Sequence, residues 1–253
     1  MQLKIDLNAD LGESYGAYRY GADEALIPLV SSVNIACGWH GGDPAAMRSA
    51  AALAAKHHVA IGAHPGYPDL AGFGRRAMAL SPKEVTDGLL YQIGALDGIC
   101  RAEGVRVRYV KPHGALYNAA AKEETLAEAV AEAIRLYDPA LVLLCPANSA
   151  MERAAKNVGV RAAREFFADR AYQNDGSLVP RSLPNAVITD EAAVCARVKT
   201  AVQTQTVLSV DGNPVSLPFD SICLHGDNPK AVRLAGSIRA ALAEADVRIA
   251  SFV

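Results

Sequence analysis

Short apolar runs alternate with amphipathic stretches along the chain, and this alternation predicts the secondary structure. The apolar runs have the length of strands and lie at residues 3–9, 31–37, 59–63, 106–111, 141–145, 160–167, 206–210, 220–224 and 247–252. Stretches with helical periodicity lie between them, at residues 43–58, 81–103, 122–137, 147–158, 189–203 and 228–245. Regular alternation of strands and helices predicts an α/β fold built around a parallel sheet.

Capping signals and loop composition support this assignment. Asp43-Pro44 and Asn228-Pro229 each place a capping residue before a proline at the first helical position. Three stretches are rich in Gly, Pro and polar residues, namely 64–80, 169–188 and 211–219. We expect active-site loops or a small excursion there rather than domain boundaries. The whole chain, residues 1–253, is therefore predicted to form one α/β-barrel domain, because such barrels commonly take about 250 residues.

Four of the six histidines occupy one repeated context, in which an apolar run is followed by His and then by a glycine turn. These histidines are His40, His64, His113 and His225. Parallel α/β folds carry their active sites at the carboxyl ends of the strands. The repeat therefore predicts a ring of imidazoles around one site, and the chain is interpreted as an enzyme.

Alternation within the first strand separates an apolar face from a polar one. Asp6, Asn8 and Asp10 share the polar face, and Glu13 follows just beyond the strand. In a barrel this face points into the lumen, where polar groups are costly unless they bind one another, a ligand or a metal. Asp6 and Asn8 can simply tie neighbouring strands together, whereas Asp10, nearer the mouth, is the stronger functional candidate.

The following strands add further candidates. Asn34 lies on the polar face of the second strand, and Gly62 lies beneath His64, where a small residue is expected to leave space for a ligand. Lys111 shares a face with His113. A lysine in this position can hold an oxyanion or a phosphate, or act as a base when it is desolvated.

Two polar loops supply charged candidates for binding. Arg75 and Arg76 lie among glycines, and paired guanidinium groups suit a carboxylate or phosphate, although a solvated surface turn is the alternative. Asp175 lies in the loop at residues 166–181, which has the length and composition of a lid or substrate-binding segment.

Composition excludes several classes of partner. A net charge of −2 gives no indication of a nucleic acid or an acidic membrane as partner. No apolar stretch approaches the roughly 20 residues of a spanning helix. The first residues lack the apolar core of a signal peptide, so a cytoplasmic protein is expected. The sequence contains neither a C-x-x-C pair nor the G-x-x-x-x-G-K-[ST] loop that binds nucleotide phosphates.

The residues leave a metal centre open. His40, His64, His113 or His225, together with Asp10, can hold a divalent ion that activates water. No H-x-x-x-H or H-E-x-x-H spacing is present, because each candidate follows a separate strand. Barrel enzymes do take catalytic groups from separate strands, so the spacing decides neither way.

Six segments, taken together, resemble one known family. They are DLNADLGESYG, NIACGWHGGDP, GAHPGYPDLAGFGRR, VKPHGALYN, RAYQNDGSLVPR and ICLHGDNP. In order and over essentially the whole chain, they resemble the LamB/YcsF family, which is taken as the A subunit of prokaryotic 5-oxoprolinase. The resemblance implies a seven-stranded variant of the β/α barrel, of the glycoside hydrolase/deacetylase type. It also implies ATP-dependent opening of 5-oxo-L-proline to L-glutamate, together with partner subunits B and C.

This resemblance suggests roles for the candidate residues. The partner subunits are expected to use ATP to phosphorylate the lactam oxygen, and this chain to hydrolyse the activated lactam. Asp10 or Glu13 is then the expected general base, and Lys111 and His113 stabilise charge on oxygen. The substrate-binding candidates are Asn8, Asn34, Arg75, Arg76 and Asp175, and the candidates for positioning water or a metal are His40, His64 and His225. Two alternatives stay open, a metal-dependent amidohydrolase or deacetylase-like enzyme and a non-catalytic lactam-binding protein within the complex.

Overall fold

The computed structural model describes residues 2–224 and 231–253, so His225 lies outside the described residues. Within them, parallel strands close into the predicted seven-stranded barrel, because β1 pairs with both β2 and β9. In their order around the barrel, the strands are β1 (Leu3–Leu11), β2 (Ser32–Ala36), β3 (Ala60–His64), β4 (Val107–Val110), β5 (Val142–Pro146), β6 (Arg161–Phe167) and β9 (Ser221–Leu224).

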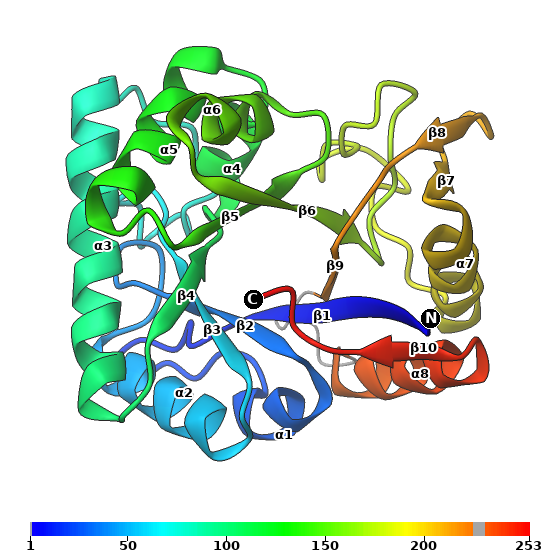
Figure 1. Ribbon diagram of the computed structural model, residues 1–253, viewed down its shortest axis with the longest axis horizontal. Helices are drawn as coiled ribbons and strands as arrows, with labels where there is room; N and C mark the ends of the chain where they lie inside the picture. The colour runs from blue at the N-terminus through cyan, green and yellow to red at the C-terminus, as the bar shows by residue number, and fades with distance from the viewer. Residues whose placement is uncertain (1, 225–230) are drawn as a thin grey trace.

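Helices surround the barrel, as Figure 1 shows. The longer ones are α2 (Pro44–Lys56), α3 (Pro82–Ala102), α5 (Glu124–Tyr137), α6 (Ala150–Val158), α7 (Glu191–Thr204) and α8 (Ala231–Glu244). Asp43 caps α2 by accepting a hydrogen bond from the Ala46 amide at 2.8 Å, as its position before Pro44 predicts. Three short pieces have too few turns to give a periodic pattern, namely α1 (Asp23–Leu26), η1 (Ile27–Leu29) and α4 (Gly114–Ala120).

One predicted strand lies outside the parallel sheet. Residues 206–210 form β7 (Thr206–Leu208), which pairs antiparallel with β8 (Pro214–Ser216) in a separate hairpin. The turn between them carries Gly212 at φ +80°, a backbone conformation that glycine adopts without strain. Leu208 is 64% exposed, whereas Val207 is buried in the core, so the hairpin packs only one of its faces against the barrel domain. The predicted strand is therefore present but outside the parallel sheet, because apolar content alone does not distinguish a barrel strand from a hairpin strand.

The carboxyl-terminal segment closes one end of the barrel. β10 (Val247–Ile249) pairs with the first part of β1, and β9 pairs with the part that follows. The last residues then lie within the ring of strands (Figure 1), where Phe252 O accepts from Arg161 at the amino end of β6 at 2.9 Å. There Phe252 packs edge-on against the Tyr109 ring, with ring centroids 5.0 Å apart.

Two apolar clusters separate the outside of the barrel from its inside. The larger one lies between the strands and the helices and includes Leu7, Ala9 and Leu11 of the face that the alternation of β1 assigned to it. The smaller one consists of Tyr109, Val142, Leu144 and Ala163 against Phe252 and Val253. Above this apolar plug the lumen is polar. No helix of the described residues is both long enough and apolar enough to cross a bilayer.

Candidate active site

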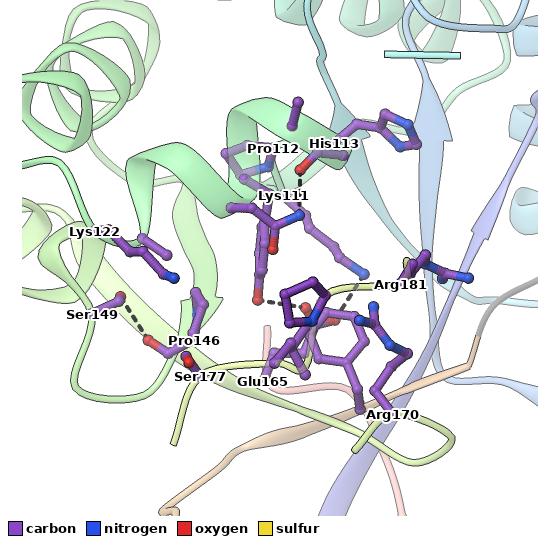
Figure 2. Close-up of a pocket in the computed structure, with 18 of the residues that line it drawn as sticks. Lys111, Pro112, His113, Lys122, Pro146, Ser149, Glu165, Arg170, Ser177 and Arg181 are labelled. Carbon is purple, nitrogen blue, oxygen red and sulfur yellow. Dashed lines mark hydrogen bonds and ion pairs between the residues drawn. The ribbon is translucent and has the colours of Figure 1, made fainter. Parts of the chain in front are cut away.

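A cavity of about 680 Å³ opens at the carboxyl ends of the strands. Lys111 and Glu165, which are only 2% and 1% exposed, are among its most deeply buried lining residues, and Asp10 lies beside them. The loops predicted at residues 64–80 and 169–188 both supply lining residues, and Figure 2 shows Arg170, Ser177 and Arg181 around the cavity. The volume suits a small molecule with a few placed polar groups.

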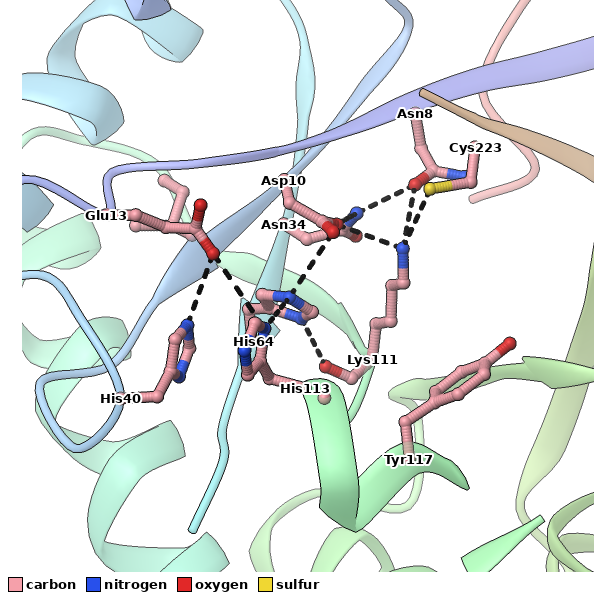
Figure 3. Close-up of polar contacts among 12 residues, drawn as sticks. Asn8, Asp10, Glu13, Asn34, His40, His64, Lys111, His113, Tyr117 and Cys223 are labelled. Atoms are coloured by element: carbon pink, nitrogen blue, oxygen red, sulfur yellow. Dashed lines mark hydrogen bonds and ion pairs between the residues drawn. The ribbon is translucent and has the colours of Figure 1, made fainter. Parts of the chain in front are cut away.

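The Lys111 ammonium is the centre of this site. It contacts Glu165 Oε1 at 2.8 Å. It also contacts Asp10 Oδ1 at 2.9 Å and donates to Cys223 Sγ at 3.1 Å (Figure 3). Burial alone would lower the pKa of Lys111, but the neighbouring carboxylates of Asp10 and Glu165 raise it well above its ordinary value. Lys111 is therefore an ammonium ion, which excludes a base role for it and leaves the role of stabilising negative charge.

The polar residues deeper in the lumen bind one another. Asn8 donates to Ser221 Oγ at 2.7 Å and to Glu165 Oε1 at 3.1 Å, and Asn34 donates to both Asn8 and Asp10. Neither asparagine lines the cavity. The structure therefore does not place Asn8 and Asn34 where they can contact a substrate. Both amides are fully buried and bond to side chains of other strands, so they cross-link the barrel.

Asp6 lies one layer deeper and is similarly enclosed. Its carboxylate accepts hydrogen bonds from Ser31 and Ser32, both at 2.6 Å, and from Ser221. Burial raises the pKa of Asp6 to about 6, although the three serine hydroxyls act in the opposite direction. Asp6 thus ties β1 to its two neighbours, as one of the two interpretations of the sequence holds.

His64 and His113 face each other at the mouth of the barrel. His64 Nε2 and His113 Nδ1 are 2.9 Å apart, with their rings at 89°. The second nitrogen of each ring meets a backbone carbonyl, His64 Nδ1 with Lys111 O at 2.7 Å and His113 Nε2 with Phe73 O at 2.8 Å. Burial lowers the pKa of His64 to about 3 and also lowers that of His113, so both rings are neutral near pH 7.

His40 and Glu13 complete a four-residue group with these two histidines. His40 stacks on His113 at a centroid distance of 3.6 Å, and its Nε2 lies 3.4 Å from Glu13 Oε1 (Figure 3). One ligand atom from each of the four residues lies within 4.8 Å of the others, and all four are buried. Three of the four predicted histidines therefore meet at one point, together with Glu13. His225 cannot be placed because it lies outside the described residues.

Glycines let the loop after β3 approach these rings closely. A Cβ on Gly74 would lie 2.7 Å from His40 Cβ and 2.8 Å from His113 Cδ2, and Gly74 has φ +63°. Gly62 has a different role from the one predicted. The ring of Tyr109 occupies the space beside it, 2.2 Å from where a Cβ would lie. The space beneath His64 is therefore filled by protein and does not hold a ligand.

The two loop arginines have different surroundings. Arg75 lines the cavity, with its guanidinium 5.0 Å from the centre of the Phe73 ring. Arg76 forms an ion pair with Asp69 and is absent from the lining, so the structure does not bring this substrate-binding candidate to the site. Asp175 is exposed and lines the cavity at the loop after β6, where it accepts a hydrogen bond from the Ser177 amide.

Two important residues were missed in the sequence. Glu165 is the second carboxylate on Lys111, and Tyr117 donates to its other oxygen at 2.9 Å. Glu165 had a usable signal, because it is a charged residue near the carboxyl end of a predicted strand, as Lys111 is. Tyr117 had none, since it lies on the short helix α4 that the pattern did not reveal.

The fold and the site together define a parallel β/α-barrel protein with a charged, small-molecule-sized cavity at the ends of its strands. The sequence profile of the LamB/YcsF family matches residues 5–253, and the chain belongs to that family.

The names of similar proteins support this family assignment. The chain is 50% identical over 247 residues to a Pyrococcus furiosus protein named as the A subunit of 5-oxoprolinase, covering 98% of this chain and 97% of that protein. It is 53% identical over 242 residues to a Bordetella pertussis protein of the same name, covering 96% of each. The crystal structure of a lactam utilization protein from Thermus thermophilus is 47% identical and superposes with a TM-score of 0.94, covering 99% of this chain and 100% of that one. The resemblance inferred from the motifs is thus confirmed.

Proposed function

We propose that this chain opens the ring of 5-oxo-L-proline to give L-glutamate, as the A component of an ATP-dependent assembly that also contains subunits B and C. The names of the relatives support the substrate and the multi-subunit organisation. Because the sequence has no phosphate-binding P-loop, the partner subunits are assigned the ATP-dependent phosphorylation of the lactam oxygen. This chain then hydrolyses the phosphorylated lactam.

One observation carries the proposal, namely the Lys111 ammonium held between Asp10 and Glu165 at the deep end of the cavity. A buried ion group of this kind stabilises the fold little compared with well-packed apolar residues. Its position among the lining residues therefore favours a chemical role. Arg75, Lys122 and Arg181 line the same cavity and suit an anionic substrate, such as a carboxylate or phosphate.

The proposed step needs one base and one cation. Asp10 takes a proton from water, and the water oxygen bonds to C5 of the phosphorylated lactam. Lys111 stabilises the negative charge on the oxygens at that carbon. The C5–N bond then breaks as Asp10 gives its proton to the ring nitrogen and takes the proton of the new C5 hydroxyl, whose oxygen becomes the carbonyl of an acyl phosphate. A second water hydrolyses this acyl phosphate to glutamate and inorganic phosphate.

The geometry favours Asp10 over Glu13 as the base. It does not favour the predicted role of His113 in stabilising charge on the substrate oxygen. The Asp10 side chain is 14% exposed and that of Glu13 is 5% exposed, and Asp10 contacts Lys111 directly. His113 directs Nε2 at the Phe73 carbonyl and Nδ1 at His64. Neither nitrogen is therefore oriented to donate a hydrogen bond to a substrate oxygen.

The division of labour is tested by reconstitution. The purified chain is incubated with 5-oxoproline and ATP, alone and with purified subunits B and C, and glutamate and ADP are measured. We expect turnover only in the complete mixture. Full turnover by this chain alone would refute the assignment of phosphorylation to the partners.

The base is tested by Asp10→Asn in the reconstituted assembly. We expect a loss of turnover of about 100-fold or more, in the range of a missing general base. Asp97→Asn is the matched control, because Asp97 is also a buried and hydrogen-bonded carboxylate but lies on α3, outside the cavity. Near-normal turnover of Asp10→Asn would remove Asp10 as the base. If Asp10→Asn and Lys111→Met changed only the affinity for substrate, the chain would be a non-catalytic binding component of the assembly.

A further inference from the structure

We propose that Glu13, His40, His64 and His113 bind one divalent transition-metal ion, with Zn²⁺ as the preferred type. No step of the proposed lactam hydrolysis uses this site, so the inference goes beyond that function. It rests on three observations: the facing nitrogens of His64 and His113, the outer partners of these rings, and the lack of hydrogen bonds at His40.

Backbone carbonyls fix the tautomers of the two facing rings. A carbonyl oxygen only accepts, so His64 Nδ1 carries a proton toward Lys111 O and His113 Nε2 carries one toward Phe73 O. In the neutral rings, the lone pairs of His64 Nε2 and His113 Nδ1 then face each other at 2.9 Å. Two lone pairs at this distance repel unless a cation lies at the point that they share. That cation is either a proton or a metal ion.

The outer contacts of the two histidines are those of metal ligands. A histidine that binds a metal almost always donates its other ring N–H to a carboxylate, a backbone carbonyl or water, which orients the ring. His64 and His113 both do so through backbone carbonyls. Gly74 brings the loop against the rings from the side, so their orientation is fixed before any ion arrives.

His40 and Glu13 favour a metal ion over a proton. His40 is fully buried, and neither of its ring nitrogens makes a hydrogen bond to the described residues. Leaving both nitrogens unsatisfied is costly, and a shared proton between His64 and His113 does not relieve that cost. Glu13 Oε1 lies 3.4 Å from His40 Nε2 and 3.8 Å from His113 Nδ1. A carboxylate oxygen therefore faces the same space as the ring nitrogens.

The donor set and the spacing together select the kind of ion. Three imidazoles and one carboxylate suit Zn²⁺ and similar ions better than Mg²⁺ or Ca²⁺, which prefer oxygen ligands. Tetrahedral Zn²⁺ places its ligand atoms about 3.3 Å apart. The contacts of 2.9, 3.4 and 3.8 Å bracket that value. The His40 ring lies flat on His113, so binding requires the His40 ring to tilt until one of its lone pairs points at the ion.

The test measures binding of the metal itself by the isolated full chain. The protein is stripped with a chelator, dialysed, and titrated with Co²⁺ and with Zn²⁺ near neutral pH. We expect one equivalent of Co²⁺ to give the intense visible absorption bands of a four-coordinate nitrogen–oxygen site, and Zn²⁺ to displace it. Thermal unfolding of the stripped chain with and without Zn²⁺ provides a second readout, because an ion that binds only the folded state raises the unfolding temperature.

Variants locate the site. His64→Gln and His113→Gln should each weaken binding by more than about 100-fold, beyond the 10- to 100-fold that loss of an outer partner costs. His57→Gln is the matched control, because His57 is an exposed histidine at the end of α2, and it should keep the full equivalent. Circular dichroism of each variant shows that it is folded. The absence of stoichiometric binding by the wild-type chain would overturn the proposal and leave a shared proton, whereas equal binding by His113→Gln would place the metal elsewhere. Both measurements use the isolated chain, so they can be read whether or not the reconstituted assembly turns over 5-oxoproline.

Discussion

Removing the Lys111 ammonium should destabilise the fold as well as the chemistry. Lys111→Met keeps most of the volume of the side chain, so the change chiefly removes the positive charge. Asp10 and Glu165 then lose the cation that lies within 2.9 Å of both. Removing one partner of a buried ion pair typically costs about 3–5 kcal/mol, a large part of a typical total stability of about 5–15 kcal/mol. We expect a loss of this size in the free energy of unfolding.

A second substitution shows whether charge is the cause. Glu165→Gln removes one of the two carboxylates, while the side-chain oxygen can still accept from the Tyr117 hydroxyl. In the Lys111→Met background it should restore about 1 kcal/mol or more, because a neutral amide costs less to bury than an unpaired carboxylate. In the wild-type background the same change should destabilise, because it removes an ion-pair partner of Lys111.

The assay is urea unfolding of the four proteins, followed by circular dichroism near neutral pH, with the coupling taken from the double-mutant cycle. If the charges are coupled, the effect of Glu165→Gln on the free energy of unfolding must be opposite in sign in the two backgrounds. Equal effects in both, or a loss below about 1 kcal/mol for Lys111→Met, would refute the reasoning about buried charge. In the reconstituted assembly, Lys111→Met should also lower turnover by about 100- to 1,000-fold, the cost of losing a donor to a developing oxyanion.

Three further predictions follow from the site and the lumen. Between pH 3.8 and pH 6, Asp6 binds a proton in the folded state but not in the unfolded state. Above pH 6 its buried carboxylate therefore lowers the free energy of unfolding by about 3 kcal/mol, and this loss disappears as the pH falls below 3.8. The stability of Asp6→Asn relative to wild type, from denaturant curves at several pH values, should therefore increase as pH rises through this window, and parallel curves would contradict the prediction. Gly62→Ala should cost about 1–3 kcal/mol, because its Cβ meets the buried Tyr109 ring, and adding Tyr109→Leu should recover part of that loss in the same measurement. Arg75→Ala should raise KM for the substrate about tenfold, ~1.4 kcal/mol, and Arg76→Ala should raise it less, because Arg76 pairs with Asp69 away from the cavity; equal effects would contradict this distinction.

Much of the fold was predictable because it depends on local periodicity. The two-residue alternation of β1 correctly separates Leu7 and Ala9 under the helices from Asp6, Asn8 and Asp10 in the lumen. Strand–helix alternation likewise predicts the parallel sheet, and the chain length and the family resemblance predict its closure into a barrel. The same apolar signal cannot say whether residues 206–210 lie in the barrel or in a hairpin, because that depends on which surface covers them.

The site was predictable in its residue types but not in its pairing. Three of the histidines were found because each follows an apolar run, and Asp10 and Lys111 because the alternation places them on inward faces of strands. The alternation gives no distance across the lumen, so it could not show that Asn8 and Asn34 bind other side chains beneath the cavity. Nor could it show that Asp69 takes Arg76, since their ion pair depends on how the loop closes.

The contacts of Lys111 also determine when during folding the site comes into existence. Asp10, Glu165 and Cys223 belong to three different strands of the barrel, and the first and last of these lie 101 and 112 residues away from Lys111 in the sequence. Contacts with such long sequence separation form late and slowly, because large loops must close first. A chain that has folded only its amino-terminal half would lack Glu165 and Cys223 around Lys111 and keep only Asp10 as its charged partner. The site around Lys111 is therefore complete only when β9 closes the barrel between β6 and β1.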